Sequence, residues 1–139
     1  MKFFTVGYGG RSPEEFLGLL KQNNVRTLVD VRLRPDRASM GIWAKAKTSD
    51  KGIEKVLGGA GIGYCSFAEL GDIFLGLPNW LELYRQLLAQ SGELLIGRLL
   101  SVPEPFCLMC AEKRVAECHR LEIAHYLVRT RGAEVQHLE

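Results

Sequence analysis

The segment CAEKRVAECHR, from Cys110 to Arg120, brings two thiols, an imidazole, carboxylates and basic side chains into one short stretch. Thiolates and imidazole are the usual ligands of a transition metal such as zinc. A cysteine at a helix start beside His and Arg also has a stabilised thiolate, which makes it a nucleophile. Arginine and free helix amides bind anions. The segment is therefore a metal site, an activated thiol, an anion-binding turn or an ordinary strand-to-helix connection.

The metal reading depends on which donors share a face. Cys107 and Cys110 fall in a predicted strand, where positions i and i+3 point to opposite faces, so we interpret Cys107 as a core residue. A different set, Cys110, Cys118 and His119 with a carboxylate, could hold one transition metal across the loop. Because adjacent residues at a helix start usually diverge, metal is the less favoured alternative. No metal and no other cofactor is predicted.

The thiol reading favours Cys118, which opens the last predicted helix beside His119 and Arg120. Cys110 is expected on the rim above it, and either thiol could serve as nucleophile while His119, Glu112 or Glu69 moves protons. The alternative is that both cysteines are packed small hydrophobes. The thiol loops of sulfurtransferases and protein phosphatases need Cys and Arg bracketing five residues. Ala116 and Ala124 occupy the two corresponding Arg positions, so that mechanism is not expected.

Other polar residues follow the ends of the remaining predicted strands. Asp30 lies within the strand LVDVR, where a buried carboxylate is costly unless it is paired. Pairing with a nearby arginine is the favoured interpretation, and a general base is the alternative. The first strand runs into the glycine turn GYGGR, whose amides could approach a ligand. The residues predicted to bind an anionic substrate are Tyr8, Gly9, Arg11, Asp30, Arg32 and Arg120.

Strands and helices alternate along the chain. Ser12, Pro13 and Glu15 predict a capped helix start, and Gly132 predicts a helix end. A helical region begins at Asn79, with an interruption expected at Ser91-Gly92. The predicted strands are 3–7, 27–32, 62–67, 105–110 and 133–138, and the predicted helices are 13–22, 53–60, 79–100 and 119–131.

This alternation predicts an α/β fold, a single-domain (1–139) doubly wound, Rossmann-like three-layer arrangement with a mainly parallel sheet of about five strands. Right-handed crossovers favour the strand order 3-2-1-4-5. Ligands of such sheets bind beyond the carboxyl ends of the strands, where the strand order reverses. We therefore expect the polar residues of all four strand ends to converge on one edge.

The bulk composition bounds the class of protein. The sequence has 139 residues, 47% of them hydrophobic, and a net charge of +2, which is too small to indicate a nucleic-acid or membrane surface. No apolar run approaches the roughly 20 residues that span a bilayer, and the short apolar start is interpreted as a strand rather than a signal peptide. We expect a cytoplasmic protein with no membrane partner, whose four cysteines are thiols. The basic loop 34–51 is the one indication of a nucleic-acid partner.

The motifs TVGYGGRSPEEF, LVDVRLRP, ELG and LMCAEKRVAECHR, in this order and spacing, resemble the bacterial and archaeal family known as domain of unknown function 488. The resemblance spans nearly the whole chain and implies a compact cytoplasmic α/β domain, without an established reaction. By position, it implies that the shared polar residues are Arg11, Asp30, Arg32, Glu69, Cys110, Glu112, Cys118, His119 and Arg120.

Two functional hypotheses follow from these residues. The first is an enzyme that binds a small anionic, phosphate- or nucleotide-like substrate and carries a reactive cysteine. The second is a non-catalytic nucleic-acid-binding or regulatory module that uses the basic loop, and the metal-dependent site at Cys110, Cys118 and His119 is a further alternative. The sequence leaves the oligomeric state open.

Overall fold

The computed structural model describes residues 1–139 and contains one sheet of five parallel strands. The strands are β1 (Lys2–Gly7), β2 (Thr27–Asp30), β3 (Gly63–Ser66), β4 (Phe106–Cys110) and β5 (Glu134–Leu138). The helices are α1 (Pro13–Gln22), α2 (Gly52–Gly58), α3 (Trp80–Leu95) and α4 (Arg120–Arg131). The predicted α/β class with a parallel sheet is confirmed, and the predicted elements agree with the observed ones to within a few residues.

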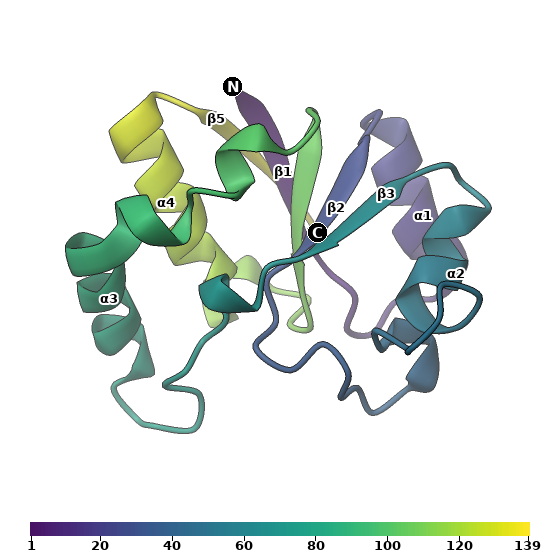
Figure 1. The fold of residues 1–139 in the computed structure, drawn as a ribbon, viewed down its shortest axis with the longest axis horizontal. Coiled ribbons are helices and arrows are strands. Elements are labelled where there is room, and N and C mark those ends of the chain that lie inside the picture. Colours follow the sequence, from purple (N-terminus) through teal and green to yellow (C-terminus); the bar gives the residue numbers. More distant parts are fainter.

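The helices cover the sheet in two pairs, α1 with α2 on one face and α3 with α4 on the other (Figure 1). Side chains alternate along the strands and build two cores. Phe106, Leu108 and Cys110 of β4 belong to a cluster of 19 buried residues under α3 and α4. Cys107 and Met109 belong to a cluster of 13 on the other face. Cys107 is therefore a core residue, as predicted, and its sulfur cannot bind the same metal ion as that of Cys110.

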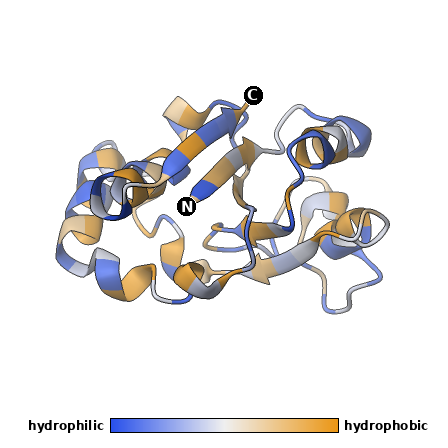
Figure 2. Cartoon of the chain, turned by 90° about the horizontal axis from the view of Figure 1, so that it is seen from above, coloured by the Kyte–Doolittle hydropathy of each residue, from blue (hydrophilic) through white to orange (hydrophobic).

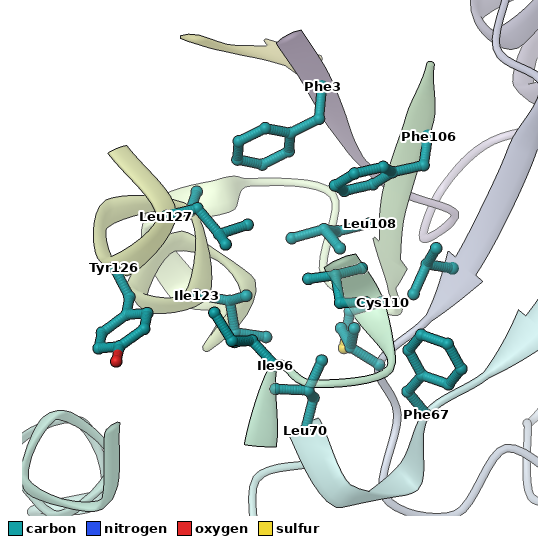
Figure 3. Packing of buried hydrophobic residues seen from close by; sticks show 14 of the residues in the cluster. Phe3, Phe67, Leu70, Ile96, Phe106, Leu108, Cys110, Ile123, Tyr126 and Leu127 are labelled. Carbon is teal, nitrogen blue, oxygen red and sulfur yellow. The ribbon is translucent and has the colours of Figure 1, made fainter. Parts of the chain in front are cut away.

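The hydropathy colouring shows the same division from a second direction, with the apolar strand residues between the two helical layers (Figure 2). In the larger core, Phe3 and Phe106 stack with their ring centroids 5.3 Å apart. Cys110 lies at one end of this row of side chains, beyond Leu108 and near Leu70 and Phe67 (Figure 3). The thiol of Cys110 therefore lies at the edge of this core, at the carboxyl end of β4.

The strand order is β3-β2-β4-β1-β5, so β1 and β4 have exchanged places relative to the predicted order 3-2-1-4-5. β4 lies between β2 and β1 and pairs with both. All five residues of β4 are buried, whereas β3 and β5 carry exposed or half-buried positions. An all-apolar strand such as β4 lies in the interior of the sheet because both of its faces are covered there. The adjacency of β1 and β4 was predicted correctly.

Local signals explain the start of α1 and the end of α4. The Glu15 amide donates to Ser12 Oγ at 3.1 Å with Pro13 in the first turn, and Gly132 ends α4 with φ of 62°. The expected interruption at Ser91-Gly92 is wrong, because α3 continues to Leu95. A Cβ at Gly92 would lie 2.4 Å from the Tyr126 ring, so this glycine allows α3 and α4 to pack closely.

Because all five strands are parallel, their carboxyl ends share one edge of the sheet. The chain leaves β1 and β2 toward α1 and α2, and it leaves β4 toward α4 on the opposite face (Figure 1). Connections that diverge in this way open a crevice between neighbouring strand ends. No helix in the structure has both the length and the apolar character required to cross a membrane.

Candidate functional site

A pocket of about 310 Å³ lies at this edge. All four predicted strand ends contribute to it. Tyr8 follows β1, Asp72 and Leu75 follow β3, and the 110–119 connection follows β4. The lining residues that follow β2 are Arg32, Leu33, Arg34 and Arg37. The members of that last connection that line the pocket are Cys110, Ala111, Glu112, Glu117, Cys118 and His119. The segment from Cys110 to His119 therefore forms one wall of the pocket.

Cys118 and His119 are neighbours in the sequence and contact each other in this wall. Cys118 Sγ lies 3.7 Å from His119 Nδ1 and accepts the Arg120 amide of α4 at 3.5 Å. On its other side, His119 Nε2 lies 2.9 Å from the carbonyl oxygen of Val31. A carbonyl only accepts, so Nε2 carries a hydrogen and Nδ1 is the nitrogen that faces the thiol. Tyr84 packs edge-on against the imidazole with its ring centroid 5.2 Å away.

The electrostatic setting separates the two thiols of the pocket. A hydrogen bond from Cys110 is the largest influence on Cys118, and with His119 and Arg120 it outweighs burial and lowers the pKa of Cys118 to about 4. The same contact, together with burial and the nearby Glu112, holds the pKa of Cys110 well above its ordinary value. Burial disfavours a charged His119, but Cys118, the Val31 carbonyl and Asp72 together outweigh it and raise the imidazole pKa. These influences favour the thiolate form at Cys118 and the protonated thiol at Cys110.

Asp30 is fully buried and ion-paired, as the sequence predicted. Its carboxylate accepts Arg32 Nε at 2.9 Å and Nη2 at 2.7 Å, and it also accepts the Tyr64 hydroxyl at 2.6 Å. Arg32 reaches on to the Tyr8 hydroxyl at 3.3 Å, and Tyr8 stacks on Trp43. Asp30 lies below the pocket and holds Arg32 in its wall, which is the structural role rather than that of a free base.

The glycine turn after β1 does not present free amides to the pocket. The Tyr8 amide donates to the Cys110 carbonyl at 3.1 Å, and the Gly9 amide donates to the Ala111 carbonyl at 2.8 Å. A Cβ on Gly7 would lie 1.7 Å from the carbonyl oxygen of Glu112. The expectation that these glycines admit a ligand to the backbone is therefore wrong: they admit the chain that carries Cys110 and Glu112.

Two predicted anion-binding arginines also lie outside the pocket lining and bind carbonyls. Arg11 donates from Nε to the Gly7 carbonyl at 2.8 Å and from Nη2 to the Leu138 carbonyl at 3.3 Å. Arg120 is fully buried and donates to the carbonyls of Glu112 at 2.6 Å and Lys113 at 3.2 Å. Both side chains fix the segments that frame the pocket.

Glu69 lies outside the pocket as well. Its carboxylate forms a two-bond ion pair with Arg98, at 2.7 Å for both contacts, and this pair lowers the Glu69 pKa. Of the eleven predicted site residues, those that line the pocket are Tyr8, Arg32, Cys110, Glu112, Cys118 and His119.

Sequence reasoning left some lining residues out of the predicted site. Arg34 and Arg37 add two exposed guanidinium groups to the pocket, and Leu33 and Leu75 add apolar surface. Arg34 and Arg37 follow a strand that ends at the same edge, which was the available signal. Asp72 and Leu75 gave none, because only the chain path after β3 brings them to the pocket.

One group of side chains has the composition and spacing to hold a metal ion. The ligand atoms of Cys110, Cys118 and His119 all lie within 4.8 Å of one another. The hydrogen bond from His119 Nε2 to Val31 leaves Nδ1 free to coordinate, and such outer contacts commonly orient metal-bound imidazoles. Two sulfurs and one nitrogen suit zinc or another soft divalent ion, with the pocket supplying space for a fourth ligand.

Most of the chain matches one known protein family. A family model described as "Domain of unknown function DUF488" matches residues 12–127. The chain belongs to this family. The match begins at the α1 cap and ends within α4, so in this DUF488 domain it includes every lining residue of the pocket except Tyr8. The comparison with curated proteins found no match, and the comparison with solved structures found none.

Proposed function

We propose that this DUF488 protein is an enzyme that binds a small anionic, phosphate- or nucleotide-like substrate at the carboxyl edge of its sheet and uses Cys118 as a nucleophile. The observation that carries the proposal is the placement of Cys118 Sγ in the pocket wall. There it accepts the Arg120 amide and faces His119 Nδ1. A thiolate stabilised by a helix amide and an imidazole is the activated form of cysteine.

The arginines of the same pocket support an anionic substrate. Arg34 and Arg37 are exposed, Arg34 has only a long contact of 3.4 Å to Asp36, and Arg32 is held in place by Asp30. Guanidinium groups bind phosphate and carboxylate oxygens through paired hydrogen bonds. The apolar side chains of Leu33 and Leu75 would contact the uncharged part of the substrate.

Thermal unfolding with a panel of phosphate, pyrophosphate and nucleoside monophosphates tests the substrate class. A ligand present at about 100 times its Kd stabilises the folded protein by about 2.7 kcal/mol, which raises Tm by several degrees. We expect the shift to disappear in the double variant Arg34→Gln, Arg37→Gln. It should persist in Arg26→Gln, a control just before β2 at the opposite edge. Absence of any shift across the panel, or a shift equal in both variants, contradicts the proposed substrate class.

His119 supplies the proton chemistry in this proposal. Its Nδ1 can accept the Cys118 proton when the thiolate forms and return it to a leaving group, while the Val31 carbonyl fixes the ring orientation. Glu112 lines the same pocket, with its carboxylate 3.5 Å from Cys110 Sγ. The free thiols accord with a cytoplasmic location, which is part of the proposal.

A metal-dependent site is the second candidate, favoured by the clustering of Cys110, Cys118 and His119 within 4.8 Å. Elemental analysis of freshly purified protein tests it. A bound zinc or similar ion should approach one equivalent, fall sharply in His119→Ala and remain in His125→Ala, a control at an exposed position of α4. Less than about a tenth of an equivalent would remove this candidate.

The non-catalytic nucleic-acid module has less support than either candidate. Arg34 and Arg37 of the basic loop line the pocket, and Lys45 pairs with Glu54 at 2.9 Å. Binding of an oligonucleotide that weakens with salt and is lost on changing Lys45 and Lys47 would favour this alternative.

A further inference from the structure

We propose that Cys110 is the resolving partner of Cys118, so that the pocket cycles between a dithiol and an intramolecular disulfide when a hydroperoxide oxidises it. The inference rests on the proposed role of Cys118 as the reactive thiol and adds a second thiol, an oxidant class and a reversible product. The observation behind it is that two sulfurs, eight residues apart in sequence, lie within 4.8 Å of each other in one pocket wall.

The two sulfurs come from different elements. Cys110 ends β4, while Cys118 immediately precedes His119 and the start of α4. A connection of 3-10 turn and irregular chain joins them. A disulfide requires a sulfur–sulfur distance of about 2.0 Å, so the side chains have to approach further. The chain between them contains no α-helix or strand that would resist this approach.

The contacts of each sulfur assign the two roles. Cys118 Sγ accepts the amide hydrogen at the start of α4, which favours the thiolate and hence the first attack. Cys110 Sγ lies 3.5 Å from Glu112 Oε2, so a carboxylate stands beside the Cys110 thiol as a proton acceptor. The other two cysteines are placed differently, because Cys107 is fully buried on the opposite face of the sheet and Cys65 does not line the pocket.

The reaction balances in two steps. In the first, the Cys118 thiolate attacks one peroxide oxygen, the O–O bond breaks, and the leaving alkoxide or hydroxide takes a proton from the His119 imidazolium, leaving Cys118 as a sulfenic acid. In the second, Cys110 sulfur attacks Cys118 sulfur, the S–O bond breaks, and the hydroxide leaves as water with the Cys110 proton, relayed by Glu112. The cysteine pair loses two electrons and the hydroperoxide gains them.

Exposure of the complete chain to hydrogen peroxide, followed by intact mass and peptide mapping, tests the inference. We expect the parent to lose about 2 Da, the two thiol hydrogens, with one disulfide joining Cys110 to Cys118 that dithiothreitol reverses. Cys110→Ser should instead hold Cys118 as a sulfenic acid that dimedone traps, and then gain about 32 Da as the sulfinic acid. Cys65→Ser is the matched control and should behave as the parent does.

The outcomes separate this inference from the proposed function. Overoxidation of Cys118 in the parent without a disulfide, or a disulfide that includes Cys65, overturns the role of Cys110. If Cys118 also reacts readily with iodoacetamide in that case, its role as the reactive thiol survives. If Cys118 resists both reagents while Cys65 reacts, the resolving pair and the reactive thiol fail together.

Discussion

His119 Nδ1 lies 3.7 Å from Cys118 Sγ, while the opposite nitrogen of the same ring is bound to a backbone carbonyl of the neighbouring strand end. The carbonyl belongs to Val31, the residue that follows β2, so the imidazole spans the gap between the β2 and β4 connections. A histidine held in this way has one orientation and one free nitrogen, and that nitrogen faces a thiol.

The first prediction concerns the pH dependence of Cys118 alkylation. With the Cys118 pKa lowered to about 4, the thiolate persists down to about pH 5, so the iodoacetamide rate should stay nearly constant from pH 8 to pH 5. An ordinary thiol loses thiolate about tenfold per pH unit over this range, because its pKa is about 8.5. The rate at Cys118, measured by mass spectrometry beside that of a free reference thiol such as glutathione in the same sample, checks this. A Cys118 rate that falls in parallel with the reference thiol would contradict the prediction.

The second prediction concerns His119. Replacing it with Gln removes a cationic partner of the Cys118 thiolate, so the Cys118 pKa should rise. The pH at which alkylation falls to half its plateau rate should then move upward by the same number of pH units, and each unit corresponds to about 1.4 kcal/mol. His125→Gln is the matched control, since His125 is exposed on α4 and lies near Glu122 rather than Cys118. Equal rates in the two variants would remove His119 from the activation of the thiol.

The third prediction concerns the buried ion pair below the pocket. Asp30→Ala leaves the Arg32 guanidinium buried without its carboxylate, so we expect a loss of about 3–5 kcal/mol in the free energy of unfolding, measured by urea denaturation. Asp36→Ala breaks the exposed pair with Arg34 and should change the free energy of unfolding little, because solvent screens that pair. A loss for Asp30→Ala as small as that control would mean that the pair does not hold the wall of the pocket.

The fourth prediction compares two glycines. Gly7→Ala places a methyl group 1.7 Å from the Glu112 carbonyl oxygen, so the Cys110 connection must move and the protein should lose more than about 2 kcal/mol of stability. Gly18→Ala adds a methyl group in α1 with nothing within 4 Å and should stabilise by about 0.5–1 kcal/mol. Urea denaturation of both variants checks the pair, and similar effects would contradict the close approach.

The fifth prediction tests the α3–α4 contact. A Cβ on Gly92 would meet the Tyr126 ring at 2.4 Å, whereas a Cβ on Gly58, at the end of α2, meets nothing within 4 Å. Gly92→Ala should therefore lower Tm by several degrees, and Gly58→Ala should change Tm little. A Tm for Gly92→Ala equal to the parent would show that the two helices adjust without strain.

The sequence by itself determined the elements, the parallel α/β class and the convergence of four strand ends. Periodicity, the Ser12 cap and the Gly132 end are local signals, and parallel strands bring their carboxyl ends together whatever their order. The pairing of Asp30 also followed from the sequence, because a carboxylate in an apolar strand needs a partner. Cys107 was assigned to the core by alternation alone.

Only the tertiary structure decided the central position of β4 and the uses of the arginines. A guanidinium can donate to backbone carbonyls as well as to anions, and the chain path alone places Arg11 and Arg120 against carbonyls and Arg34 and Arg37 in the pocket. The approach of Cys110 to Cys118 likewise depends on how the connection after β4 folds back. That path is set by a contact between residues far apart in the sequence, in which the Glu112 carbonyl lies against Gly7 at the end of β1.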